Sequence, residues 1–433
     1  MRHFVSLCFL SIAFTDIGIG ALLREKNVKI RPVEDRTLQR SDKNAKSLAS
    51  IISPQLGPND DLDLAFIMDT TGSMGSYIRT AKDNIRQIVD DITTDSGVNI
   101  RLALIEYRDH KPQEKTFVTR LNDFTSSVTT MKSWLNNANA KGGGDKPEAV
   151  AEAMFDTTKL SWRPDATKIA VMISDAPPHG LVPSEDRDFP EGSPNGHDPI
   201  TIAQDFAQMG VTLYAIGCEP AIYKYKDFFE ALAYITGGQY VPLTEPNLLV
   251  DAITGGAQEE LSLKRFDGLV QAEVQRSARR SSKGASVTIN KDKIATDVFK
   301  KLKAAGAKTK QLVQNNKALG GPSKEAKQLA KLKSLAEVRK VFKKKSGSRP
   351  GSLSGLTSSF RRKSHVKGPS IRRKSFGGLR FDVPSAGRRR TFPKISSIKS
   401  SSWKDKLSTV ESDITMEQVR RMVQRRTSKM PGL

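Results

Sequence analysis

Residues 62–73 read Leu-Asp-Leu-Ala-Phe-Ile-Met-Asp-Thr-Thr-Gly-Ser. The first seven residues are mostly apolar, which is typical of a strand that is buried on both faces of a sheet. Asp69, Thr71 and Ser73 then follow at every second position. Apolar residues at helical spacing follow over 78–92. The stretch therefore predicts a buried strand, a polar loop and a helix, in that order.

The same alternation continues to about residue 263. Apolar runs that indicate strands recur at 100–107, 116–121, 168–173, 211–216 and 239–242. Helices are expected between or after them at 128–138, 147–160, 200–209, 225–235 and 248–263. Strands that alternate with helices predict an α/β domain over 61–263, with a doubly wound, mostly parallel, Rossmann-like sheet. Ligands of such sheets bind at the carboxyl ends of the strands.

Polar side chains gather at three of these predicted loops. The loop after the first strand carries Asp69, Thr71 and Ser73, a glycine-rich loop spans 142–148, and Asp175 follows the strand at 168–173. Hydroxyl and carboxylate oxygens suit a hard cation, Mg²⁺ before Ca²⁺ or Mn²⁺. The first loop alone would more simply cap the following helix. The order of all three loops favours a metal site.

The sequences of these loops are similar to a known site. Asp-Thr-Thr-Gly-Ser at 69–73, Gly-Gly-Gly-Asp at 142–145 and Ser-Asp-Ala-Pro-Pro at 174–178 together resemble the metal-ion-dependent adhesion site of von Willebrand factor A domains. The pattern is closest to the A domain of von Willebrand-type alpha-kinases. The resemblance covers about 200 residues, under half of the 433 in the chain.

The resemblance implies a role for each candidate ligand. Thr71 and Ser73 would bind the metal directly or through one water, and Asp69 and Asp175 largely through water. Two residues compete for the remaining position, which lies in the glycine-rich loop: they are Asp145 and Glu148. An acidic residue of a partner protein would complete the octahedron, which is a mechanism of binding rather than catalysis.

Enzymatic alternatives find less support. No cysteine follows Cys218, whereas an alpha-kinase domain would, by resemblance, need a zinc site with cysteines. Residues 69–73 also resemble the phosphorylation motif of P-type ATPases, but the chain has no Gly-Asp-Gly metal motif. We therefore expect no enzyme activity, and a metal-dependent phosphatase-like reaction stays as the enzymatic alternative.

The charge of the chain is strongly uneven. Residues 1–263 hold 26 Lys and Arg against 36 Asp and Glu, while 264–433 hold 44 against 11. The second part predicts a basic, low-complexity and largely disordered arm at 264–410, with amphipathic helices around 294–302 and 329–342. Such an arm is expected to bind polyanions: nucleic acid, an anionic membrane or an acidic protein. This is the main alternative function.

Short motifs in the arm indicate regulation. Arg-Arg-x-Ser occurs four times and resembles sites for basophilic kinases, which would modify Ser282, Ser364, Ser375 and Ser428. Each phosphate would subtract about 1.5 to 2 charges. A short helix is expected at 411–433, where Thr415 and Gln418 have the spacing of a capping box.

The N-terminus allows two interpretations. Residues 1–23 form an apolar leader that is either a secretory signal or a disordered segment, and 24–60 have the composition of a linker. The kinase-type motifs favour the cytoplasm, whereas a cleaved leader would make the protein extracellular.

Overall fold

The computed structural model describes residues 60–281, 289–345 and 405–429. All of them belong to one compact unit of the chain. The predicted leader and linker lie outside the described residues, as do Ser282, Ser364 and Ser375. Within the described ranges, no helix has both the length and the apolar character needed to cross a bilayer.

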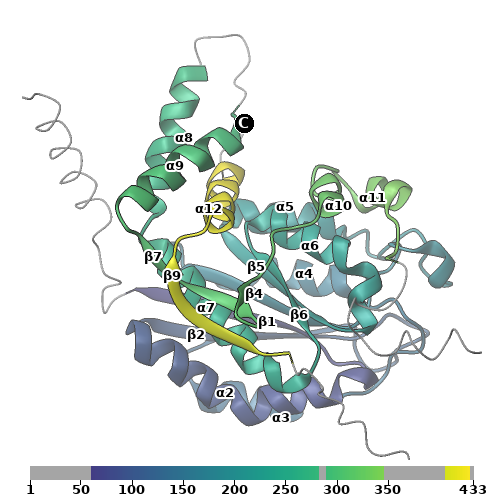
Figure 1. Cartoon of the computed structure of the whole chain (residues 1–433). Helices are drawn as coiled ribbons and strands as arrows, with labels where there is room; N and C mark the ends of the chain where they lie inside the picture. Colours follow the sequence, from purple (N-terminus) through teal and green to yellow (C-terminus); the bar gives the residue numbers. More distant parts are fainter. Residues whose placement is uncertain (1–59, 282–288, 346–404, 430–433) are drawn as a thin grey trace, which may run out of the picture. The chain divides into compact units, whose positions relative to one another are not determined.

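A six-stranded sheet forms the centre of the fold (Figure 1). Its strand order is β3-β2-β1-β4-β5-β6, and only β3 runs antiparallel to its neighbour. The strands are β1 (Asp61–Asp69), β2 (Asn99–Tyr107), β3 (Thr119–Thr125), β4 (Thr167–Ser174), β5 (Val211–Cys218) and β6 (Gln239–Leu243). The predicted doubly wound, mostly parallel α/β sheet is confirmed.

Helices cover both faces of this sheet (Figure 1). One face packs against α2 (Gly75–Ser96), α3 (Val128–Asn137) and α7 (Leu249–Lys264), and the other against α4 (Val150–Thr158), α5 (Pro199–Met209) and α6 (Lys226–Thr236). Successive residues of β1 point to opposite faces, so Leu64 and Phe66 join the first core while Ala65 and Ile67 join the second. This double burial explains why the run is almost continuously apolar.

Two boundaries differ from the sequence prediction. The edge strand β3 begins at Thr119 rather than at 116, and α4 begins at Val150 rather than at 147. The helix starts late because Glu148 is held in an extended bridge to Pro178, with its backbone N–H donating to the carbonyl of Pro177 at 3.0 Å. Pro147 therefore lies in a loop and not in a first helical turn.

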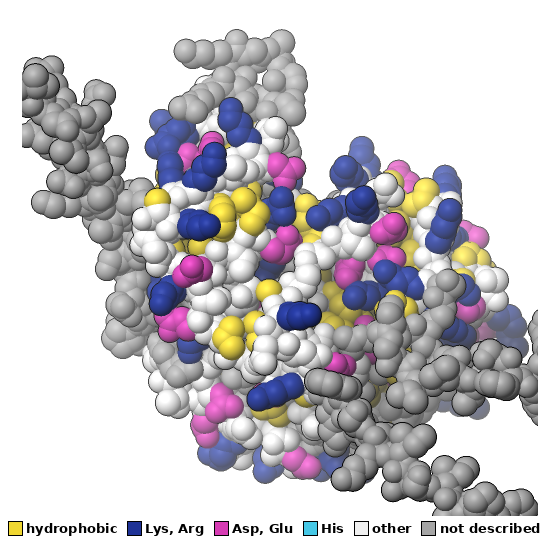
Figure 2. Space-filling view, viewed as in Figure 1, with side chains coloured by type: hydrophobic (Ala, Val, Ile, Leu, Met, Phe, Trp, Pro, Cys, Tyr) yellow, Lys and Arg dark blue, Asp and Glu magenta, His cyan; other side chains and the backbone are white. Residues whose placement is uncertain are grey.

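Parts of the basic arm fold onto the domain, so the fold does not end at residue 263. The described elements are α8 (Asp267–Ser281), α9 (Lys291–Ala304), β7 (Lys308–Gln314), β8 (Lys317–Ala318), α10 (Lys324–Leu329), α11 (Leu335–Val341), β9 (Leu407–Asp413) and α12 (Met416–Ser428). Lys and Arg side chains lie over this part of the surface (Figure 2). Most apolar residues of these elements are nevertheless buried, with Val341 and Val410 as exposed exceptions.

The arm contributes to all three apolar cores, and Leu312 of β7 and Leu407 of β9 belong to the first of them. The apolar face predicted for the helix around 294–302, now α9, packs with α8 and α12 in a third apolar cluster. Val298 and Leu302 are fully buried there. Residues 329–342 are not one amphipathic helix but parts of two short helices, α10 and α11, which pack against the α4–α6 layer. Ser334 separates them because its side chain accepts a hydrogen bond from the backbone of Glu337 and caps α11.

Helix α12 is fixed to the domain by buried charges. It begins with the predicted capping box of Thr415 and Gln418. Its Arg421 donates to Glu259 at 2.8 Å and also contacts Glu260, and both carboxylates are buried. Burial works to raise the pKa of Glu260, but the charges of Arg425 and Arg421 outweigh it and the net pKa is lowered.

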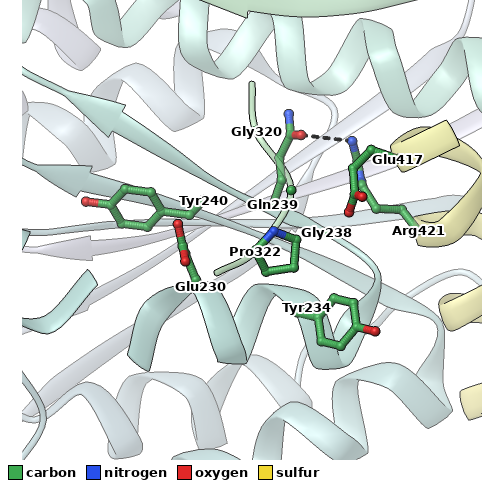
Figure 3. Close-up of a pocket in the computed structure, with 10 residues that line it drawn as sticks. Glu230, Tyr234, Gly238, Gln239, Tyr240, Gly320, Pro322, Glu417 and Arg421 are labelled. Carbon is green, nitrogen blue, oxygen red and sulfur yellow. Dashed lines mark hydrogen bonds between the residues drawn. The ribbon is translucent and has the colours of Figure 1, made fainter. Parts of the chain in front are cut away.

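A small cavity lies beside this contact (Figure 3). Arg421 donates across it to the side chain of Gln239 at 3.0 Å, and Tyr234, Tyr240 and Glu417 line its walls. Its volume is about 20 Å³, which is room for one water molecule. The cavity is therefore a packing gap between arm and domain rather than a ligand site.

Candidate metal centre

The topology brings two candidate ligands to one point. Strands β1 and β4 are parallel neighbours, with Met68 paired to Ile173. Asp69 and Asp175 therefore leave the sheet next to each other at its carboxyl edge. The chain passes from β1 to β2 on one side, whereas β4 lies on the other side, so this is the switch point where ligands of such sheets bind.

The first loop is held by its own side chains. Asp69 is fully buried, and its Oδ1 accepts hydrogen bonds from the backbone N–H of Thr71 at 2.9 Å and from its hydroxyl at 2.7 Å. The Thr71 hydroxyl lies 3.5 Å from that of Ser73, which in turn bonds to Asp175. Neither the short helix η1 (Gly72–Met74) nor α2 has a side-chain cap. Helix capping therefore does not account for these residues.

The glycine-rich loop packs directly on the first loop. The backbone N–H of Gly72 donates to the carbonyl of Gly142 at 3.1 Å. At Gly143, where φ is +80°, an added Cβ would lie 2.9 Å from Glu148 Oε1 and 3.2 Å from Thr71 Cβ. Only glycine allows this approach, because a side chain would need both a strained φ and the space that Glu148 occupies.

The resulting cluster has an excess of negative charge. Burial, then the charge of Asp175, raises the pKa of Asp69 to about 7. Burial, then Asp69 and Asp109, raises the pKa of Glu148 to about 11. Asp69 Oδ2, Glu148 Oε2 and both oxygens of Asp145 are buried without a hydrogen-bond partner. Buried polar atoms are rarely left in this state, so the cluster lacks a positive partner.

A divalent cation fits this donor set. The available atoms are hydroxyl and carboxylate oxygens, which hard cations prefer. No group of three or more His, Cys, Asp and Glu side chains is placed to hold a metal among the described residues. The cluster therefore differs from an all-carboxylate cage or a zinc site, and any ion would depend on the hydroxyls of Thr71 and Ser73.

The two rival residues of the glycine-rich loop face different neighbours. The pKa of Glu148 responds to both Asp69 and Asp175, which places it at the centre of the cluster. The pKa of Asp145 is raised to about 6 by burial, then by the charge of the neighbouring Asp109 carboxylate. Both line a cleft of about 500 Å³ together with Ser73 and Asp175.

A buried network behind the centre was missed by sequence reasoning. His179 Nε2 lies 2.6 Å from Asp109, and its Nδ1 lies 3.1 Å from Asp186. Asp186 also accepts from the backbone N–H of Gly180 at 2.8 Å, which orders the long 176–199 loop. The three residues join the loops after β2 and β4, but their sequence separation gives no pattern that would have connected them.

Comparison with known proteins identifies the class. Residues 63–240 match the family model of the von Willebrand factor type A domain. The chain therefore contains such a domain, as its loops predicted. These domains are commonly protein-interaction modules and often bind a divalent metal through an adhesion site of the kind described above.

The individual relatives match less than half of this chain. The alpha-protein kinase vwkA of Dictyostelium discoideum is 30% identical over 155 residues, which are 35% of this chain and 24% of that protein. The putative ariadne-like RING finger protein R811 of Acanthamoeba polyphaga mimivirus is 27% identical over 194 residues, 43% of this chain and 18% of that protein. The chain thus spans less than a quarter of the length of either relative.

Solved structures are more distant. The von Willebrand factor type A structure from Catenulispora acidiphila is 14% identical, covers 47% of this chain and 43% of that chain, and has a TM-score of 0.33. The predicted similarity to the A domain of an alpha-kinase is confirmed by the relative from Dictyostelium. No kinase-domain match accompanies it in this chain.

Proposed function

We propose that the domain binds a partner protein through a divalent cation, with Mg²⁺ as the preferred ion. Thr71 and Ser73 would contribute hydroxyl oxygens, and Asp69 and Asp175 would contribute carboxylates, directly or through water. The bound ion would supply a Lewis-acidic position that a carboxylate of the partner can occupy. The buried and unpartnered carboxylate oxygens of Asp69, Asp145 and Glu148 carry this proposal, together with the open cleft that Asp145 and Glu148 line.

We assign the loop position to Glu148 rather than to Asp145. Glu148 is electrostatically coupled to both Asp69 and Asp175, whereas the main neighbour of Asp145 is Asp109. The missing Cβ of Gly143 leaves room for both the Glu148 carboxylate and the Thr71 side chain. Asp145 then borders the cleft beside the ion.

Hydrolysis is not part of the proposal. The most suitable general base near the centre would be His179, but both of its ring nitrogens are engaged by Asp109 and Asp186. A base needs a free nitrogen within reach of the proton that it removes. Release of phosphate from a phosphatase substrate in Mg²⁺ by the full chain, lost in Asp175→Ala, would contradict this assignment.

Thermal unfolding of the full chain tests the metal site. Mg²⁺ should raise the melting temperature of the natural protein, because a ligand that binds only the folded state stabilises it. The double variant Asp69→Ala/Asp175→Ala should lose this shift. Asp83→Ala, which removes an exposed carboxylate from α2, is the matched control and should keep it. An undiminished Mg²⁺ shift in the double variant would place the ion elsewhere.

The folded arm supports a second function, the binding of polyanions. Residues 289–345 hold 17 Lys and Arg against 4 Asp and Glu, and their apolar side chains are used in packing. The free charge would attract nucleic acid, anionic membrane or acidic protein. Affinity for an anionic probe should fall steeply with salt, and affinity retained near 0.5 M salt would exclude a phosphate-driven mode.

Phosphorylation by a basophilic kinase stays a prediction for Ser282, Ser364 and Ser375. Ser428 is a poorer candidate, because Arg425 of its motif is paired with buried Glu260 and is not free to bind a kinase. Mapping of phosphate after treatment with a basophilic kinase would test all four positions.

A further inference from the structure

The cleft above the candidate metal centre is lined by both acidic and basic residues. Ser73, Glu148 and Asp175 belong to the proposed ion site. The short helix η3 (Ala221–Tyr225) and the residue that follows Asp145 line the same cleft. A volume of about 500 Å³ exceeds what one carboxylate needs and is in the range of sites that take several side chains.

Two lysines, Lys146 and Lys224, line the same cleft as the proposed ion site. Lys146 is 58% exposed, and its ammonium is 3.4 Å from Glu185, which makes a long surface ion pair worth about 0 to 1 kcal/mol. Lys224 is exposed, and its ammonium has no ion-pair partner within the ranges that the structure describes. Both charges are therefore available to a ligand.

The folded arm keeps Lys146 available. Lys344, just beyond α11, contacts the same oxygen of Glu185 at the shorter distance of 2.8 Å, and Tyr225 also donates to Glu185. Glu185 thus has two other donors and does not depend on Lys146. The backbone N–H of Lys345 donates to the carbonyl of Lys224 at 3.1 Å, which fixes the arm along η3.

We propose that this cleft docks an acidic peptide segment of a partner protein that carries at least two carboxylates. One carboxylate binds the metal ion, and a second is held by Lys146 and Lys224. The inference rests on the proposed function, and it adds that these two lysines select ligands with clustered Asp or Glu over those with a single acidic residue. Charge complementarity between the lysines and the ligand is its basis.

Peptide binding by the full chain in Mg²⁺ tests the inference. The probes are a fluorescent oligo-aspartate peptide and a matched oligo-asparagine peptide with a single aspartate, followed by anisotropy. Lys146→Gln/Lys224→Gln should lower the affinity for the first probe about tenfold, which is about 1.4 kcal/mol. The affinity for the second probe and the Mg²⁺ shift in melting temperature should stay unchanged. The control Lys331→Gln/Lys333→Gln removes the same charge from exposed positions on the α10–α11 connection and should bind both probes normally.

The possible failures are distinguishable. An equal loss of oligo-aspartate affinity in the lysine variant and in its control would show a general charge effect and overturn the inference. An unchanged oligo-aspartate affinity in the lysine variant would also overturn it. In both cases an intact Mg²⁺ shift would leave the proposed function standing. Peptide binding that persists in EDTA, together with no Mg²⁺ shift in the natural protein, would instead overturn the proposed function itself.

Discussion

Replacement of Asp69 by asparagine should make the protein more stable than the natural chain in the absence of metal and less stable than it in the presence of metal. In the metal-free fold the pKa of Asp69 is raised from 3.8 to about 7, first by burial and then by Asp175. The folded state therefore binds this proton more tightly than the unfolded state, and the free energy of unfolding falls as pH rises from about 4 to about 7. This pKa difference of about three units corresponds to an upper limit of about 4 kcal/mol on the change in the free energy of unfolding.

Asparagine removes the charge but keeps a carbonyl oxygen for the two hydrogen bonds from Thr71. We expect Asp69→Asn to gain roughly 1 to 3 kcal/mol in EDTA at pH 8, or about 3 to 10 °C in melting temperature. At pH 5 the gain should fall to roughly a third, because only about one of the three pH units between the unfolded and folded pKa values of Asp69 has then been crossed. In Mg²⁺ the order should reverse, since the natural protein gains a ligand that the variant binds poorly.

Thermal unfolding of the full chain at both pH values, in EDTA and in Mg²⁺, measures all four cases. Asp83→Asn, on the exposed side of α2, is the control for a general change of charge. A variant that is less stable than the natural protein in EDTA at pH 8 would refute the reasoning. So would a difference that does not depend on pH.

Other substitutions test the surroundings of the centre. Arg421→Ala leaves buried Glu259 without its cationic partner and Glu260 with Arg425 alone, and it should cost about 3 to 5 kcal/mol in urea unfolding, whereas the half-exposed Arg420→Ala should cost under about 1 kcal/mol. Gly143→Ala should abolish the Mg²⁺ shift without unfolding the domain, and an unchanged shift would show that the loop tolerates a Cβ. His179→Asn should lower the affinity for Mg²⁺ about tenfold, as measured by calorimetry. An unchanged affinity would show that the network behind the centre is purely structural.

The sequence predicted the sheet and three loops of the centre because both follow from local patterns. Residues 62–68 are apolar on both faces, and the polar residues come where each strand ends. The proposed assignment of the loop position to Glu148 rather than Asp145 needed three-dimensional information. It rests on the Glu148 carboxylate lying beside Gly143, and spacing along the chain does not determine that position.

The folded part of the arm was harder to predict. Its basic composition is typical of disorder, yet α9 buries a stripe from Ile294 to Leu302 and turns its lysines to solvent. Strand β7 pairs with β9 about a hundred residues later, as in the pair Lys308 and Asp413. No local sequence pattern predicts a pairing over that separation. The contact of Arg421 with Glu259 is likewise not predictable from local sequence.

Direct titration of a spin-active substitute for Mg²⁺ tests the central claim. Mn²⁺ prefers the same oxygen ligands, and its paramagnetic resonance signal separates free from bound ion. The full natural chain should show one saturable site that Mg²⁺ displaces, and Ser73→Ala/Asp175→Ala should lose it while Asp83→Ala keeps it. The same affinity and stoichiometry in the double variant would contradict a metal centre at the ends of β1 and β4.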